Sequence, residues 1–212
     1  MTRLFIVISL FMAFLFSCKD KTSKKGKEET ISTKGTAQTV ASNKDSVLLR
    51  LTIDILKEIK NKNYSAFANF IDPTSGIRFS PYGFIDTASH VVFSKEKFVE
   101  QITRAKQNKI LWGEFDGSGD PINMTLNEYM QKFVYDVDFA KPEKQKVNDF
   151  IGGGNSLNNL LVVYKGCDFT ESHFSGLEKK YEGMDWRSLR LVFKETSGKF
   201  WLVGIVHDQW TI

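Results

Sequence analysis

Acid–base catalysis needs side chains that exchange a proton near neutral pH, and this 212-residue chain contains three histidines. His207 and Asp208 are adjacent in a stretch that we predict to be a strand, so their side chains point to opposite faces and cannot pair with each other. His173 and Asp185 are the other candidate titrating groups. Each of the four either faces a cavity or makes a structural hydrogen bond, and the sequence leaves both alternatives open.

Two further groups of acids or imidazoles deserve a chemical interpretation. Asp136 and Asp138 lie on one face if residues 135–139 are extended, where they would form a general-base pair; a solvated loop is the alternative. His90 follows Ala88 and Ser89 in a predicted loop, where we expect it to be solvated.

Metal and phosphate motifs each fail at a defined position. Acids alternate along residues 114–120, but Pro121 and Asn127 stand where a calcium loop needs glycine and glutamate. Gly152-Gly153-Gly154 lacks the lysine and the strand-to-helix context of a phosphate loop. The three dispersed histidines and Cys167 do not have the sequence spacing that is typical of zinc ligands. We therefore expect no metal and no cofactor.

Aromatic residues form the other candidate site. Trp112, Tyr135, Trp186 and Trp210, together with Arg187, could line an aromatic pocket. Ordinary core packing is the alternative, because large aromatic side chains dominate the interior of domains that contain many of them.

The elements that must position these residues follow from periodicity and capping. Ser94 and the Thr125-x-x-Glu128 box predict helix starts, and Thr196-Ser197-Gly198 predicts a hairpin turn. We expect helices over about 46–59, 64–70, 95–105 and 126–133. We expect strands over 160–165, 168–174, 188–195 and 199–208, with shorter strands at 76–80 and 110–115.

This order of elements predicts an α+β domain over residues 45–212, with N-terminal helices packed on a curved antiparallel sheet. The last strand is apolar on both faces, since Trp201, Val203 and Ile205 alternate with Leu202 and Val206. We therefore expect it in the middle of the sheet, with helices on one side and a concavity on the other.

The net charge of +4 is unevenly distributed. Residues 1–44 carry eight Lys or Arg and three Asp or Glu, a net charge of +5, which leaves residues 45–212 with 21 against 22, a net charge of −1. A nucleic-acid partner is therefore not expected of the folded part. Residues 18–44 are poor in apolar side chains and are predicted to be a flexible stalk.

The N-terminus resembles a bacterial lipoprotein signal. Leu4–Phe16 is an apolar run shorter than the roughly 20 residues that span a bilayer, and Leu15, Phe16 and Ser17 precede Cys18 as in a lipobox. The resemblance implies that residues 1–17 are removed and that Cys18 carries the acyl anchor. Lys19, rather than aspartate, follows the cysteine, which implies the outer membrane if the source is a diderm bacterium.

The helix, short helix, strand, helix and paired-strand order resembles the nuclear transport factor 2-like, or ketosteroid-isomerase-like, fold. The segment 61–67 resembles the passage from the first to the second helix of such domains. The stretches 183–187 and 204–210 are similar to those of exported bacterial proteins. The resemblance implies a conical cavity that some members use for ligands or catalysis and others for association. It carries no catalytic residue onto this chain.

Two functional hypotheses follow. The first is a non-enzymatic envelope lipoprotein whose pocket binds a small ligand or another envelope protein, with a homodimer left open. The alternative is an enzyme of the ketosteroid-isomerase-like type that uses the cavity for acid–base chemistry. Clustering of His207, Asp208, Asp185 and His173 around one pocket favours the enzyme, whereas burial in separate structural hydrogen bonds favours binding.

Overall fold

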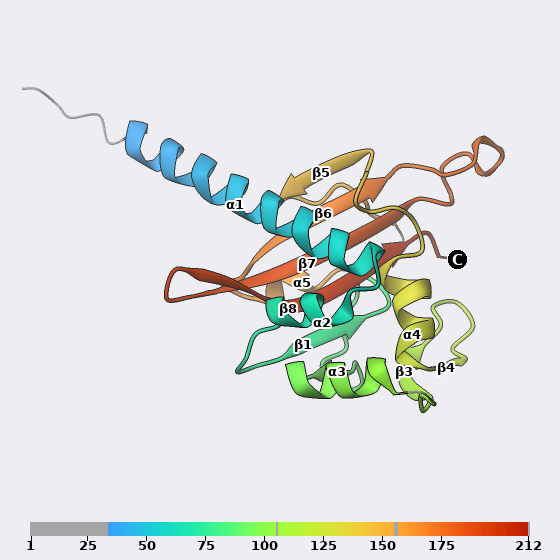
Figure 1. Cartoon of the computed structure of the whole chain (residues 1–212). Coiled ribbons are helices and arrows are strands. Elements are labelled where there is room, and N and C mark those ends of the chain that lie inside the picture. Colours follow the sequence, from blue (N-terminus) through green and yellow to red (C-terminus); the bar gives the residue numbers. More distant parts are fainter. Residues whose placement is uncertain (1–33, 105, 155–156, 212) are drawn as a thin grey trace, which may run out of the picture.

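A six-stranded mixed sheet with the strand order β2-β1-β8-β7-β6-β5 is the centre of the structure, and β3 pairs with β4 in a separate two-stranded sheet. The computed structural model describes residues 34–104, 106–154 and 157–211. Figure 1 shows α1 and α2 lying across one face of the large sheet, with α3, α4 and the β3–β4 hairpin gathered near one end. The fold is therefore α+β, as the sequence predicts.

The described helices are α1 (Lys34–Lys60), α2 (Tyr64–Phe67), α3 (Lys95–Thr103), α4 (Leu126–Tyr129) and α5 (Leu160–Val163). Short 3₁₀ turns cover Ala68–Phe70 and Lys179–Tyr181, and a π turn covers Met130–Val134. None of the described helices combines the length and the apolar character needed to cross a bilayer.

The strands are β1 (Ile77–Ser80), β2 (Val92–Phe93), β3 (Ile110–Glu114), β4 (Pro121–Met124), β5 (Lys144–Val147), β6 (Asp168–Phe174), β7 (Arg187–Thr196) and β8 (Lys199–Gln209). The sheet is mixed rather than purely antiparallel, because β1 runs parallel to β8 while the other neighbours are antiparallel. This corrects the predicted antiparallel sheet. β8 lies inside the sheet between β1 and β7, where its two apolar faces predicted it.

Local sequence explains most of the element boundaries. The Ser94 hydroxyl accepts a hydrogen bond from the Lys97 amide at 3.2 Å and starts α3. Thr125 and Glu128 make the full capping box at the start of α4. The β7–β8 hairpin turns at Ser197 and Gly198, which have φ of 53° and 75°, as a two-residue turn requires.

Two boundaries differ from the predictions. α1 begins at Lys34, so residues 34–44, assigned to the stalk by composition, are helical. Lys44 is held against the sheet by an ion pair with Asp168 at 2.8 Å. Residues 160–163 form α5 instead of a strand: Leu160 is buried but Val162 is 80% exposed, so the apolar run is not the interior strand that it resembles.

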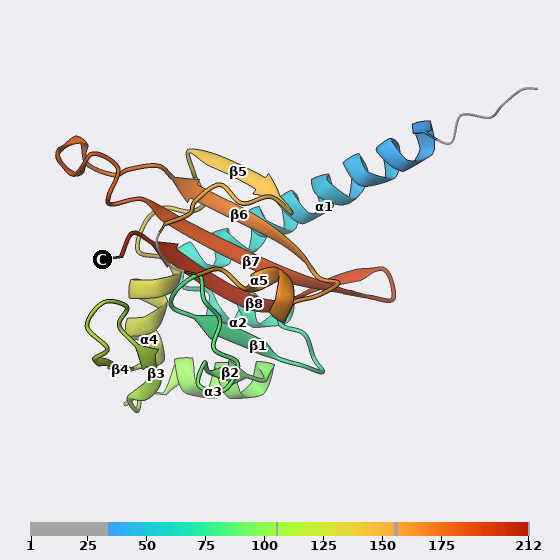
Figure 2. The ribbon, with the colours of Figure 1, turned by 180° about the vertical axis from the view of Figure 1, so that it is seen from behind.

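The two faces of the sheet carry separate cores. On the helix-covered face, the buried residues of α1 (Leu48, Ile55, Leu56 and Ile59) join a large aromatic core. The opposite face, seen in Figure 2, is covered by α5 and the segment that leads to it. A smaller core lies there, formed by Ile85, Leu160, Phe169, Val192, Val203 and Val206. Beyond this smaller core, the same face of β6, β7 and β8 carries buried polar residues.

Candidate functional site

The four candidate titrating groups do not meet around one cavity. Asp208 and His207 lie on opposite faces of β8, as predicted: Asp208 contacts Arg190 and His207 contacts the Pro81 carbonyl. Asp185 accepts a hydrogen bond from the Glu178 amide at 2.8 Å in the loop before β7. His173 bonds to Ser188, which bonds to Glu171, so His173 and Asp208 are joined only indirectly, through buried Glu171 and Arg190.

A buried charge cluster occupies the second face of the sheet. Arg190 is fully buried; its Nε donates to Glu171 at 2.9 Å and its Nη1 donates to Asp208 at 2.8 Å. Burial raises the pKa of Asp208, although the adjacent guanidinium opposes this shift. Glu171 is also fully buried, so one cation serves two carboxylates away from water. We call Glu171, Arg190 and Asp208 the charge cluster.

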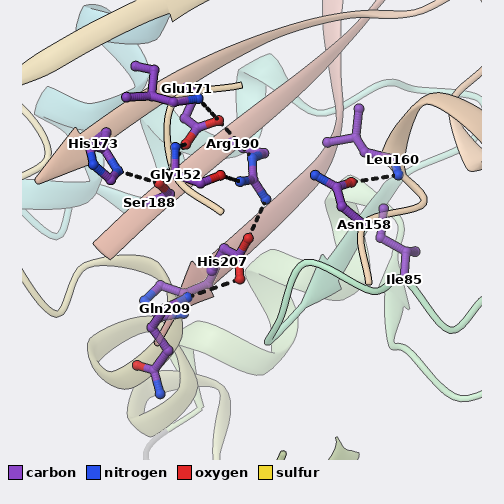
Figure 3. A network of polar contacts seen from close by, with 12 residues as sticks. Ile85, Gly152, Asn158, Leu160, Glu171, His173, Ser188, Arg190, His207 and Gln209 are labelled. Carbon is purple, nitrogen blue, oxygen red and sulfur yellow. Dashed lines mark hydrogen bonds and ion pairs between the residues drawn. The ribbon is translucent and has the colours of Figure 1, made fainter. Parts of the chain in front are cut away.

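The backbone of Gly152 packs over the charge cluster and makes hydrogen bonds to two of its residues (Figure 3). Its N–H donates to Glu171 at 2.8 Å and its carbonyl accepts from Arg190 Nη2 at 2.9 Å. A Cβ at this position would overlap the Ser188 hydroxyl and lie 2.9 Å from His173 Nδ1. The glycine of the Gly152-Gly153-Gly154 run thus serves close packing, because only a residue without a side chain fits between the loop and the sheet.

The neighbouring serine, histidine and glutamate do not make a nucleophilic triad. The Ser188 hydroxyl donates to Glu171 at 2.5 Å, and His173 Nδ1 lies 2.8 Å from the same hydroxyl. In a triad the histidine lies between the serine and the acid, whereas here the serine occupies that position. Ser188 is fully buried beneath Gly152, so a substrate has no access to it.

On the helix-covered face, His207 and Asp136 form a second polar contact. His207 Nε2 lies 3.4 Å from Asp136 Oδ1, and Arg187 Nε donates to Asp136 Oδ2 at 2.8 Å. Burial raises the pKa of Asp136, but the neighbouring imidazole and guanidinium outweigh this effect and lower it. Residues 135–139 are not extended, and Asp138 contacts Lys60 and Tyr135 instead. Of the two alternatives, the segment is a loop, and Asp136 and Asp138 do not form a general-base pair.

A concavity lies elsewhere in the described part of the chain, between the loop that follows β1 and the β3–β4 hairpin. It has a volume of about 720 Å³ and opens to solvent. We call it the hairpin pocket; it is lined by Tyr82, Phe84, Asp86, Ser89, His90, Leu111, Gly113, Glu114, Phe115, Asp116, Gly117, Gly119, Pro121, Leu157 and Thr211. Its volume is within the usual range for small-molecule sites.

Apolar side chains stand exposed around the hairpin pocket. Phe84 is 47% exposed, Leu111 60% and Leu157 75%. These residues come from three separate segments, and two of the segments are tied together: the Asn159 amide both accepts from the Ile85 N–H and donates to the Ile85 carbonyl. At the rim, apolar groups that would be stabilised by burial therefore remain in contact with water.

His90 is a lining residue that the sequence prediction placed in solvent. Its ring is half-buried, and Nδ1 accepts a hydrogen bond from the Asp86 amide at 3.2 Å. Burial lowers the pKa of His90 to about 4, so the ring is neutral at physiological pH. Because Nδ1 is the acceptor, the proton of the neutral ring lies on Nε2.

The five residues predicted to line an aromatic pocket are dispersed. Trp112 is fully buried in the core and stacks on Tyr129, with ring centroids 3.9 Å apart. Trp186 packs against His173 over the charge cluster, and Arg187 pairs with Asp136. Tyr135 donates to Asp138, and Trp210 lies at the end of the chain, 37% exposed. None of the five lines the hairpin pocket.

The pocket-lining residues were missed because loops and the β3–β4 hairpin supply them together. Glu114 and Asp116 were considered only within a failed calcium motif, Asp86 was given no role, and no periodicity connects residues 82–90 with 111–121. Leu157, which stands between Ser156 and Asn158, was the available signal, whereas Leu111 lies between Ile110 and Trp112 and looks like any other strand residue.

Two further points concern metal binding and lipid attachment. No group of three or more metal-binding side chains occurs within the described residues. Cys167 is half-buried and burial raises its pKa, which disfavours the reactive thiolate. Cys18, the predicted lipid attachment site, lies outside the described residues. Comparison with protein-family models, curated proteins and solved structures finds no match to this chain.

Proposed function

We propose that this protein is an envelope lipoprotein whose folded domain is a binding module, with the hairpin pocket as its ligand site. The observation that carries the proposal is the pocket itself: a concavity of about 720 Å³ with Phe84, Leu111 and Leu157 exposed at its rim. A ligand that covers these side chains gains hydrophobic free energy without any rearrangement of the sheet.

The enzymatic alternative required the titrating candidates to converge on one cavity. Asp185 and His207 instead make separate structural contacts, His173 and Asp208 belong to a buried structural network, and none of the four lines the hairpin pocket. This arrangement supports the binding hypothesis over ketosteroid-isomerase-like chemistry.

The membrane attachment and the finer fold assignment rest on the sequence. The lipobox residues before Cys18 and the polar stretch after it support a lipid-anchored domain at the cell envelope, in the outer membrane if the source is a diderm bacterium. Helices first and long paired strands last support a nuclear transport factor 2-like arrangement. An envelope protein, rather than a small molecule, is the other occupant that the pocket rim would suit.

The anchor is tested with Cys18→Ser in the native host. We expect the variant to leave the membrane fraction and to lose the mass of the acyl chains, because the remaining signal run is too short for a stable anchor. Unchanged membrane retention together with unchanged mass would contradict the lipoprotein assignment.

The pocket is tested by screening a broad fragment library by NMR against wild type and two matched variants. Leu157→Trp narrows the mouth of the pocket, whereas Leu161→Trp adds the same bulk at another exposed position outside it. We expect hits on wild type that weaken at least tenfold in Leu157→Trp and persist in Leu161→Trp. The absence of any hit, or hits whose affinity is unchanged in Leu157→Trp, would refute the binding site.

A further inference from the structure

The hairpin pocket has an unbalanced charge. Asp86, Glu114 and Asp116 line it, and none of its lining residues in the described chain is a lysine or arginine. The Asp86 carboxylate is held ionised, since hydrogen bonds from Ser89 and Ala88 lower its pKa. Three carboxylates around one concavity give it a negative potential that favours a cationic occupant.

The imidazole in the pocket does not offset this charge. His90 has a pKa of about 4 because of burial, and its Nδ1 accepts from the Asp86 amide. At neutral pH the ring is therefore an uncharged group that presents its Nε2–H, and the pocket keeps its negative balance.

Two cations, Arg78 and Lys132, contact residues at the edge of the pocket. Arg78 Nη1 donates to the carbonyls of Thr87 and His90, at 3.2 and 3.0 Å, and so supports the loop from outside the lining. Lys132 Nζ lies 5.4 Å from the centroid of the Phe115 ring, and Phe115 is itself a lining residue. An ammonium group already uses one aromatic ring of this region, which indicates that such rings suit cations.

The rest of the lining is apolar and aromatic. Tyr82, Phe84 and Phe115 bring three rings to the cavity, and Leu111 and Leu157 stand at its mouth. A strongly hydrated polyamine would leave these groups uncovered, and a carboxylate or phosphate would meet the negative field. A ligand with one cationic head and an apolar body satisfies both the charge and the apolar surface.

We propose that the hairpin pocket binds a small organic cation, an ammonium or guanidinium group joined to an apolar body. The inference rests on the proposed function and adds the chemical class of the ligand. The cationic head lies among Glu114, Asp116 and the aromatic rings, and the body covers Phe84 and Leu157. Asp86 maintains the loop through its bonds to Ala88 and Ser89 and adds to the field.

The test uses three probes with one common body: 4-phenylbutylamine, 4-phenylbutanol and 4-phenylbutyrate. Affinities are measured by calorimetry or NMR titration at low and high salt with wild-type domain. We expect the amine to bind at least tenfold more tightly than the alcohol, the carboxylate to bind most weakly, and added salt to weaken the amine alone.

The matched variants isolate charge from shape. Glu114→Gln with Asp116→Asn removes two pocket carboxylates, and Asp54→Asn with Glu195→Gln removes two exposed carboxylates outside the pocket. We expect the pocket pair to lower amine affinity about tenfold and to leave alcohol affinity unchanged, and the control pair to change neither.

The outcomes separate this inference from the proposed function. Equal or tighter binding of the alcohol or carboxylate at the hairpin pocket overturns the cation inference and leaves the binding site standing. Absence of binding by all three probes also overturns it. If the broad fragment screen is empty as well, the proposed function fails with it.

Discussion

Carboxylates have opposite environments in two regions of this molecule. In the charge cluster, Glu171 and Asp208 are buried and share one guanidinium, that of Arg190. In the hairpin pocket, Glu114 and Asp116 are exposed, and no ion pair to either is found among the described residues. Both regions are acidic, yet only one provides its own cation.

The difference separates charges that build the fold from charges that remain for a ligand. A buried carboxylate without a cation costs several kcal/mol, so the two acids of the charge cluster need a cation within the fold. Exposed acids at a concavity cost little, because water solvates them until a ligand arrives. Mutations in the two regions should therefore affect different measurements, stability in the first and binding in the second.

The largest expected effect comes from Arg190→Met. It leaves Glu171 and Asp208 buried without their common partner, and we expect a loss of about 3–5 kcal/mol in the free energy of unfolding. Urea denaturation measures it. The matched change Arg104→Met removes an exposed partner of Glu100 and should cost at most about 1 kcal/mol. Equal losses in the two variants would show that the charge cluster does not stabilise the fold.

A smaller loss should follow from Gly152→Ala. The new methyl group would overlap the Ser188 hydroxyl and press on His173 and Trp186, so the loop has to shift, at a cost of about 1–3 kcal/mol.

Gly153→Ala is the matched control for this change. Nothing lies within 4 Å of a Cβ at that neighbouring glycine, so its unfolding free energy should stay within about 0.5 kcal/mol of wild type. If both alanine variants denature at the same urea concentration, Gly152 does not pack over the charge cluster as described.

His90 in the hairpin pocket should make the free energy of unfolding depend on pH. The pKa of His90 in the folded protein, about 4, lies below its ordinary value of 6.5. Between these two pH values the unfolded chain binds more protons than the folded protein. Stability therefore falls as the pH is lowered from about 6.5 to about 4. For this partly exposed ring we expect a contribution of about 1–2 kcal/mol after solvent screening.

The measurement is the difference in unfolding free energy between wild type and His90→Gln across that pH range. Subtraction removes the contributions of His173, whose pKa burial lowers, and of Asp208, whose pKa burial raises. The difference should decrease from pH 6.5 to pH 4. A difference that is independent of pH would show that His90 titrates as a solvated ring.

The smallest effect on stability belongs to the pocket acids. Glu114→Gln with Asp116→Asn should change the unfolding free energy by no more than about 0.5 kcal/mol, because both side chains are exposed. A loss above about 1.5 kcal/mol would place these acids among the charges that build the fold and would remove the contrast with the charge cluster.

Local features were predictable from sequence because their causes are local. Ser94, the Thr125–Glu128 box and the Ser197-Gly198 turn each act within a few residues, and all three appear where they were predicted. Residues 160–163 were predicted wrongly because a short apolar run fits a buried strand and a helical turn equally well. There the Asn158 side chain accepts the Leu160 amide, which favours the turn.

The charge cluster depends on strand register, which the sequence does not specify. Extended from the Thr196–Lys199 pair, the hairpin would place Ser188 opposite His207. A bulge between Val192 and Phe193 shifts the register, so Ser188 pairs with Asp208 and that carboxylate reaches the face of Arg190. One inserted residue thus decides which of the two adjacent candidates joins the cluster.

The hairpin pocket was not predictable for a different reason. Its walls come from loops and from the β3–β4 hairpin, and two of these segments are joined by distant contacts between Asn159 and Ile85. No periodic pattern records such contacts, and a loop acid has the same sequence signature whether it faces open solvent or a concavity.

The central claim, that recognition takes place in the hairpin pocket and not at the charge cluster, is tested most directly by NMR. Backbone amide shifts are followed while 4-phenylbutylamine is titrated into the wild-type domain. The account predicts changes concentrated in residues 82–90 and 111–119, with Ser188 and Arg190 unaffected. Changes centred on the charge cluster, or no changes in the pocket segments at millimolar probe, would contradict it.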